Sequence, residues 1–191
     1  MEYVLIFIGA VFVNNIVLAQ FLGICPFIGV SKKVETAIGM SAAVAFVMAI
    51  STLATFLVQK YILDPLDLGY MQTVSFILII AALVQLVEIV LKKVSRPLYQ
   101  ALGVFLPLIT TNCIILGIAI IVIQKGFDLP TALVYAVSTA IGFGVALIIF
   151  SGIREQLSLT RLPKGVAGTP IALIVAGILA MAFMGFAGIV K

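Results

Sequence analysis

Apolar residues run along this chain in six long stretches, separated by short segments that hold most of its charged residues. Each stretch is about 20 residues or longer, the length that a helix needs to cross about 30 Å of hydrocarbon. The pattern predicts an all-α integral membrane protein with six transmembrane helices. The expected spans are residues 3–22, 37–59, 71–91, 98–123, 131–151 and 169–190.

Composition supports a protein that lies almost wholly in the membrane. Of 191 residues, 64% are hydrophobic and 9% are charged, whereas soluble domains average roughly 25% charged residues. The connections are too short for a soluble domain, so we expect any catalytic head to belong to another chain. The first span lacks a basic segment before it and a small-residue cleavage site after it, so we expect it to stay as a mature helix.

Basic residues indicate the orientation of the spans. The first, third and fifth connections hold eight Lys and Arg residues, and the opposite side holds three. Because positive residues favour the cytoplasmic side, we expect these three connections to be cytoplasmic and both termini to lie outside. This bias accounts for the net charge of +4, which therefore does not indicate a nucleic-acid partner.

The two halves of the chain resemble each other. A shift of 98 residues places Asn14 on Asn112 and Asn15 on Cys113, and it also aligns the span boundaries. Three helices per half put the second half in the membrane with the opposite orientation. We therefore predict an inverted repeat of 3+3 helices, with residues 1–95 as the first repeat and residues 96–191 as the second.

The first and fourth spans are expected to be interrupted helices. Between polar markers their apolar segments run from Tyr3 to Val30 and from Pro97 to Gln124, 28 residues each, which exceeds one straight crossing. Gly23 and Pro26 punctuate the first span, and Gly103 and Pro107 punctuate the fourth. Proline removes a backbone donor and clashes with the preceding turn, so we expect the breaks at these positions. Inverted-repeat proteins place functional sites where such helices are broken.

Cys25 and Cys113 are the candidate metal ligands. They are the only cysteines, the chain has no histidine, and each lies within one of the spans expected to be interrupted. A structural zinc or iron–sulfur site needs about four such ligands. The chain can therefore supply half of a site at most.

Polar residues beside these cysteines have two interpretations. Asn14, Asn15, Thr111 and Asn112 lie within apolar spans, where each polar group needs a hydrogen-bond partner. They either join helices to one another, or cover the free backbone groups of the breaks and donate hydrogen bonds to sulfur. Adjacency to Cys113 favours the second role for Thr111 and Asn112.

Glu88 is the only acidic residue inside a predicted span. A carboxylate within a membrane is a candidate for an ion pathway. Lys92 follows four residues later, the spacing of an ion pair on one helix face, and we favour this pairing. Gln85, one turn earlier, extends the same face and keeps an ion pathway as the alternative.

Four segments closely resemble the family of A-type membrane subunits of Rnf electron-transport complexes, and the resemblance spans essentially the whole chain. Related E-type subunits of sodium-pumping NADH:quinone reductases share the architecture, but Asn14-Asn15 and Cys25-Pro26-Phe27 are more similar to the Rnf branch. The segments are VNNIVLAQFLGICPFIGVSKKVETAIGM (residues 13–40), LGVFLPLITTNCIILG (102–117), GIRE (152–155) and AFMGFAGIVK (182–191).

The resemblance implies a role in an ion-translocating oxidoreductase of a bacterial or archaeal cytoplasmic membrane. Such a complex couples electron flow between ferredoxin and NAD to the transport of Na+ or H+. The resemblance further implies that Cys25 and Cys113 contribute two ligands to a [2Fe–2S] cluster shared with a homologous E-type subunit. Flavins, the NAD site and the other iron–sulfur clusters would belong to partner subunits of the B, C, D and G types, so this chain would hold no complete active site.

Three alternatives compete with this hypothesis. The chain would be an E-type component of a sodium-pumping NADH:quinone reductase, or a small secondary transporter whose cysteines are inert. It would otherwise be a structural subunit with a disulfide between Cys25 and Cys113, which requires their Cα atoms to lie within about 7 Å.

Overall fold

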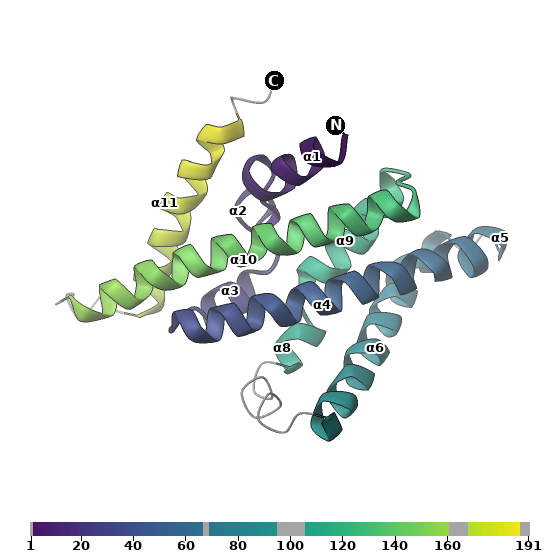
Figure 1. The fold of residues 1–191 in the computed structure, drawn as a ribbon, viewed down its shortest axis with the longest axis horizontal. Helices are drawn as coiled ribbons and strands as arrows, with labels where there is room; N and C mark the ends of the chain where they lie inside the picture. Colours follow the sequence, from purple (N-terminus) through teal and green to yellow (C-terminus); the bar gives the residue numbers. More distant parts are fainter. Residues whose placement is uncertain (1, 67–68, 95–105, 161–167, 188–191) are drawn as a thin grey trace. The chain divides into compact units, whose positions relative to one another are not determined.

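The computed structural model describes residues 2–66, 69–94, 106–160 and 168–187, and every regular element in these ranges is a helix (Figure 1). Three of the segments are short π or 3-10 turns that continue or precede an α-helix. In chain order the elements are α1 (Glu2–Ile8), η1 (Gly9–Val13), α2 (Ile16–Gln20), α3 (Ile24–Gly29), α4 (Val34–Val58), η2 (Gln59–Leu63), α5 (Asp64–Leu66), η3 (Gly69–Met71), α6 (Gln72–Val94), α8 (Leu106–Thr110), α9 (Cys113–Gln124), α10 (Leu129–Leu159) and α11 (Thr169–Ala187).

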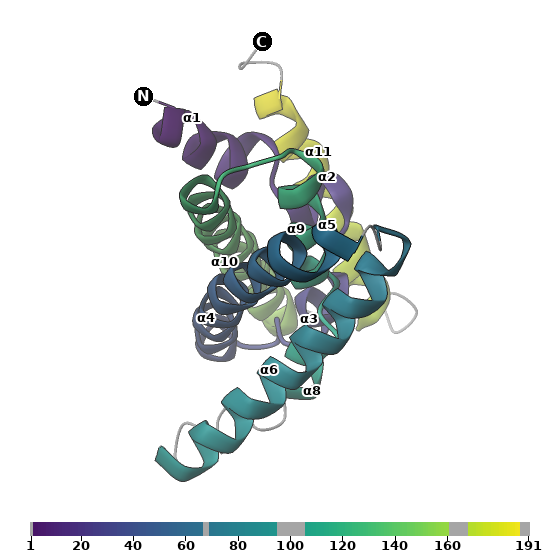
Figure 2. The same cartoon turned by 90° about the vertical axis from the view of Figure 1, so that its right-hand side faces the viewer.

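The helices form two compact units, the first comprising Met1–Ala42 and Ser138–Lys191 and the second comprising Ala43–Val137. In the first unit α11 packs against η1 and α2, and in the second α6 packs against α8 and α9 (Figures 1 and 2). Each unit takes residues from both predicted repeats, so the packing units and the repeats are different divisions of the chain.

Four helical stretches in the described part of the chain are long and apolar enough to cross a membrane. They coincide with the second to fifth predicted spans, although residues 98–105 of the fourth span lie outside the described residues. The first and sixth spans correspond to shorter apolar helices, Tyr3–Val13 and Thr169–Gly185. The four long stretches are Val34–Leu63, Gly69–Ile89, Pro107–Gln124 and Leu129–Leu159.

The first predicted span is broken twice. The helix formed by α1 and η1 ends at Asn14, whose φ of −110° and ψ of 51° are not helical. The next helix, α2, ends at Phe21 in the left-handed conformation, and α3 starts after Gly23, which is also left-handed. Pro26 is the third residue of α3, where a helix needs no backbone donor. Gly23 thus lies at a break, as predicted, but Pro26 does not cause one.

Asn15 closes the first of these breaks. Its Oδ1 accepts a hydrogen bond from the backbone N–H of Val17 at 3.2 Å and so caps α2. Its Nδ2 donates to the carbonyl oxygens of Val11, at 3.1 Å, and Gly142, at 2.8 Å. The side chain is 1% exposed, so all of its hydrogen bonds are made inside the protein.

Gly142 lets α10 approach this break closely. A Cβ atom added there would lie 3.0 Å from the carbonyl oxygen of Ala10 and 3.1 Å from the Cα of Val11. Both are backbone atoms and cannot swing aside as the end of a side chain can. The absence of a side chain at residue 142 is therefore what brings its carbonyl within reach of Asn15.

The fourth predicted span breaks at Thr111 and Asn112, between α8 and α9. Asn112 has an extended backbone, and its Oδ1 accepts from the N–H of Ile114 at 3.3 Å. This is the conformation and cap of Asn15, 97 residues earlier. The local structure thus matches Asn112 to Asn15, whereas the 98-residue shift pairs it with Asn14.

Proline does not make the second break either. Pro107 is the second residue of α8, a position where its missing N–H costs nothing. Gly103, the other expected breaker, lies outside the described residues. In both spans a helix restarts after a break at an asparagine N-cap, Asn15 before α2 and Asn112 before α9, and not at a proline.

Replacing Gly142 with alanine should destabilise the first unit. The new methyl group would force the backbone of residues 10 and 11 away from α10, and overpacking of this kind costs about 1–3 kcal/mol. Gly152→Ala is the matched control on the same helix, because a Cβ there meets nothing within 4 Å. Thermal unfolding in detergent should show a lower midpoint for Gly142→Ala only, and equal midpoints for the two variants would contradict the close contact.

Asn15→Ala should destabilise the protein more than Asn14→Ala. The first change removes the cap of α2 and the side-chain hydrogen bonds to the carbonyls of Val11 and Gly142, which together cost about 2–4 kcal/mol. Asn14 is exposed, so its truncation should change stability by less than about 1 kcal/mol. Chemical denaturation of both variants in the same detergent measures the difference, and a larger loss for Asn14→Ala would refute the assignment.

Candidate functional site

Cys25 is the second residue of α3 and follows closely on the left-handed Gly23. The cysteine is in no disulfide and is exposed. Phe27, two residues later, is buried at 2% exposure. Because two residues turn a helix by about 200°, the two side chains leave α3 on opposite sides, and α3 presents the thiol outward from its packed face.

Cys113 is the first residue of α9 and directly follows the cap residue Asn112. It is also in no disulfide, and it is half-buried. The backbone N–H groups of the first turn have no partner within the helix, and the positive end of the helix dipole lies there. This position stabilises negative charge, as a metal-ligating thiolate requires.

The side-chain amide of Asn112 is a hydrogen-bond donor next to Cys113. Its Oδ1 is used by the cap, but its Nδ2 is buried and has no hydrogen-bond partner among the described residues. The residue is 4% exposed, so bulk water does not satisfy this amide. Thr111 differs, because it is exposed and its hydroxyl donates to the carbonyl of Pro107 at 3.1 Å.

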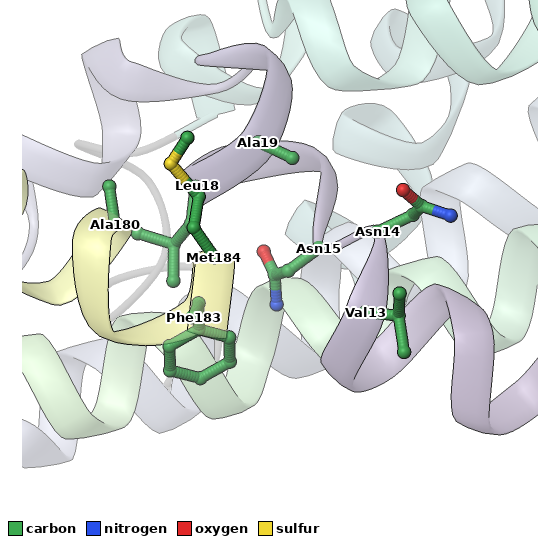
Figure 3. Close-up of a pocket in the computed structure, with 8 residues that line it drawn as sticks. All are labelled: Val13, Asn14, Asn15, Leu18, Ala19, Ala180, Phe183 and Met184. Carbon is green, nitrogen blue, oxygen red and sulfur yellow. The ribbon is translucent and has the colours of Figure 1, made fainter. Parts of the chain in front are cut away.

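Asn14 and Asn15 point to opposite sides of the first break (Figure 3). Both amide hydrogens of Asn15 are engaged with carbonyl oxygens, so its observed role is to hold the break. Asn14 is exposed, and a role near sulfur stays a prediction for it. A cavity of about 90 Å³ lies beside the break and is apolar except for these two residues; it is lined by Val13, Asn14, Asn15, Leu18, Ala19, Ala180, Phe183 and Met184.

The two residues considered for an ion pathway lie on α6. Gln85 is exposed and Glu88 is half-buried, one turn further along the helix. Lys92 is exposed and follows Glu88 by four residues on the same helix. The ion pair and the ion pathway both stay predictions.

The described residues contain no group of three or more Cys, Asp or Glu side chains that could hold a metal ion, and the sequence has no histidine. Cys25 belongs to the first unit and Cys113 to the second. Each thiol lies in the first turn of its helix, and the Nδ2 of Asn112 beside Cys113 has no hydrogen-bond partner among the described residues. A site with four thiolates requires two from another chain, because this sequence contains two cysteines.

One residue near the candidate site was not identified from the sequence. Arg154 of α10 donates from Nη1 to the carbonyl of Ile28 and to the hydroxyl of Ser31, both at 2.7 Å. These acceptors lie at and just beyond the C-terminal end of α3, the helix that carries Cys25. The sequence could have indicated it, because Arg154 closely follows the long apolar run of the fifth predicted span and a charge beside such a run needs a partner.

Comparison with known proteins confirms the resemblance found in the sequence. The family described as "Rnf-Nqr subunit, membrane protein" matches residues 3–190. The chain is 58% identical to the A-type subunit of the Na(+)-translocating ferredoxin:NAD(+) oxidoreductase complex of Acetobacterium woodii, over 98% of each chain. It is 57% identical to the A-type subunit of the ion-translocating oxidoreductase complex of Syntrophotalea carbinolica, over 97% of this chain and 96% of the relative. The protein therefore belongs to the Rnf-Nqr family of multi-pass membrane subunits.

Proposed function

We propose that this chain is the A-type membrane subunit of an ion-translocating ferredoxin:NAD oxidoreductase. Two relatives whose names describe ion-translocating oxidoreductase complexes match it at 57–58% identity over nearly their whole length. The chain would be one component of a translocase that moves Na+ or H+. Ferredoxin and NAD would react on partner subunits of the B, C, D and G types, together with their flavins and other iron–sulfur clusters.

Within this complex, Cys25 and Cys113 would hold one half of a [2Fe–2S] cluster. The observation that carries this proposal is that both thiols lie in the first turn of a helix that begins at a break in an apolar segment. The other two thiolates would come from a homologous E-type subunit. When bound, the cluster supplies one-electron transfer within the membrane.

The chain's own residues would orient the two thiols and set their surroundings. Asn15 and Gly142 hold the break that precedes α2 and α3. Asn112 caps α9, and beside Cys113 its Nδ2 has no hydrogen-bond partner among the described residues. A hydrogen bond from this amide to sulfur would stabilise the more negative reduced state and raise the potential of the site.

The proposed topology is six spans in two inverted repeats, with both termini outside the cytoplasm. The matching caps at Asn15 and Asn112 support the repeat, because they give the first helix of each half the same break. The excess of Lys and Arg in the odd connections supports the orientation. The two halves would then approach the membrane from opposite sides, as in other inverted-repeat proteins.

A secondary transporter with inert cysteines is the main competing function. It would use the same inverted repeat but would not need accessible thiols at both breaks. An E-type role in a sodium-pumping NADH:quinone reductase would keep the cysteines but change the electron donor and acceptor. The structural role would need the two cysteines, which are free in the structure, to be joined in a disulfide.

Replacing either cysteine with serine should remove the cluster from the intact complex. Cys25→Ser and Cys113→Ser each delete one of four thiolates, and a hydroxyl is a poor substitute for a soft sulfur ligand. Electron paramagnetic resonance of the reduced complex should lose one [2Fe–2S] signal, and iron and labile sulfide should fall by about two atoms each, the content of one such cluster.

Ala82→Ser is the matched control, since it adds a hydroxyl to an exposed position of α6 without removing sulfur. The control complex should keep the signal and its ion transport. A double variant, Cys25→Ser with Cys113→Ser, that retained both the signal and ferredoxin-linked ion transport would favour the transporter with inert cysteines.

Asn112→Asp should lower the midpoint potential of the cluster. The carboxylate keeps the cap of α9, but it replaces an amide donor with a negative charge that opposes reduction. The shift should be on the order of tens of millivolts, where about 59 mV is a tenfold change for a one-electron couple. Redox titration of the reduced signal measures it, with Thr111→Ser as the neighbouring control, and an unchanged or higher potential in Asn112→Asp would contradict the proposed donor.

A further inference from the structure

We propose that Arg154 is a positioning residue for Cys25. By binding the C-terminal end of α3 through Ile28 and Ser31, it fixes the short helix that presents the thiol. This inference rests on the proposed function, in which Cys25 is a cluster ligand. It assigns a role to the Gly152–Glu155 segment, which the cysteine chemistry alone leaves unexplained.

Arg154 makes three contacts in the first unit. Its Nη1 donates to the carbonyl oxygen of Ile28 and to the Oγ of Ser31, each at 2.7 Å. Its guanidinium also lies over the ring of Phe150, with Cζ 5.8 Å from the ring centroid. Phe150 in turn stacks on Phe27 of α3, with centroids 4.3 Å apart and ring planes 17° apart.

These contacts decide where α3 lies, because the helix has little stability of its own. It contains six residues, whereas isolated helices shorter than about 12 residues are marginal even in favourable sequences. Ile28 is next to the last residue, where the carbonyl has no partner within the helix. The Ser31 hydroxyl donates to this carbonyl at 3.4 Å, and Arg154 adds a shorter bond from a charged donor, which is about twice as strong as a neutral one.

We call the contacts of Arg154 and Phe150 with Phe27, Ile28 and Ser31 the clamp. The clamp contacts the side of α3 that faces away from the thiol. Phe27 is buried against Phe150, and Cys25 leaves the opposite side of the helix and is exposed. Holding the buried face and the last turn therefore orients the exposed face without covering it. A thiol presented in this way is accessible to a cluster held partly by another chain.

Glu155, the residue after Arg154, contacts the start of α4, across the turn that connects α3 to α4. Glu155 Oε2 accepts from the backbone N–H of Val34, the first residue of α4, at 3.4 Å. Thr36, the third residue of α4, donates from Oγ1 to the carbonyl of Val30 at 3.1 Å. Two adjacent residues of α10 thus fix the end of α3 and the start of α4.

Arg154→Gln tests the inference in the intact, detergent-solubilised complex. Losing the charged donor should speed amide hydrogen exchange of Phe27 and Val30 about tenfold or more. It should also speed alkylation of Cys25 by N-ethylmaleimide, measured by peptide mass spectrometry, and shift the g values of the [2Fe–2S] signal. Lys32→Gln is the matched control, because it removes an exposed positive charge beside Ser31 without touching the clamp.

Ser31→Ala and Ser31→Thr separate the hydrogen bond from the fold. The alanine variant removes one acceptor of Arg154 and the longer bond from Ser31 Oγ to the carbonyl of Ile28, and it should give the same changes to a smaller extent. Threonine restores the hydroxyl and should return all three readouts to the parent values. If Arg154→Gln prevents assembly, this pair decides the question. Exchange, alkylation and g values equal to the parent in both Arg154→Gln and Ser31→Ala would overturn the positioning role.

The parent complex shows whether the proposed function itself fails. Cys25 that reacts with N-ethylmaleimide as fast in the folded complex as in denatured protein is not a cluster ligand, and this result overturns the ligand assignment. Faster amide exchange in Arg154→Gln would then still support the clamp on α3. A protected Cys25 in the parent that becomes reactive in Arg154→Gln supports both.

Discussion

The structure depends on hydrogen bonds to the backbone N–H and carbonyl groups that lose their helical partners where a helix is interrupted, in an environment that offers no water. A helix that stops inside a hydrocarbon layer exposes N–H and carbonyl groups, each costing several kcal/mol if unpaired. Asn15 meets this demand at the first break, accepting from Val17 and donating to Val11 and Gly142. Asn112 meets part of it at the second break, where its Oδ1 caps α9 and its Nδ2 has no partner among the described residues.

Each break converts an apolar segment into a place where polar chemistry is possible. A new helix start provides unpaired N–H groups, and both cysteines lie in such first turns. The short helix α3 has low intrinsic stability. Contacts from Arg154 and Phe150 of the neighbouring helix α10 stabilise it. The same devices that hold the fold therefore orient the groups proposed to bind the cluster.

Hydropathy predicted the long helices well because spanning length and apolar composition are local properties. The sequence also predicted that two spans are interrupted, at Gly23 and Pro26 and at Gly103 and Pro107. Gly23 does lie at a break, in the left-handed conformation, whereas Pro26 and Pro107 lie in first turns where proline is tolerated. The contacts that build the site were beyond sequence reasoning, because they join distant residues. Asn15 reaches Gly142 across 127 positions, and Arg154 reaches Ile28 across 126. The cysteines were identifiable by elimination, whereas their surroundings required the fold.

The central claim is that this chain supplies two thiolates of a metal–sulfur cluster and a second chain supplies the others. A high-resolution cryo-electron microscopy map of the intact, anaerobically purified complex tests it most directly. The account predicts one metal density bonded to the sulfurs of Cys25 and Cys113 and to two cysteine sulfurs of a homologous protein chain. A map in which the two thiols are well resolved and neither touches metal density would contradict it.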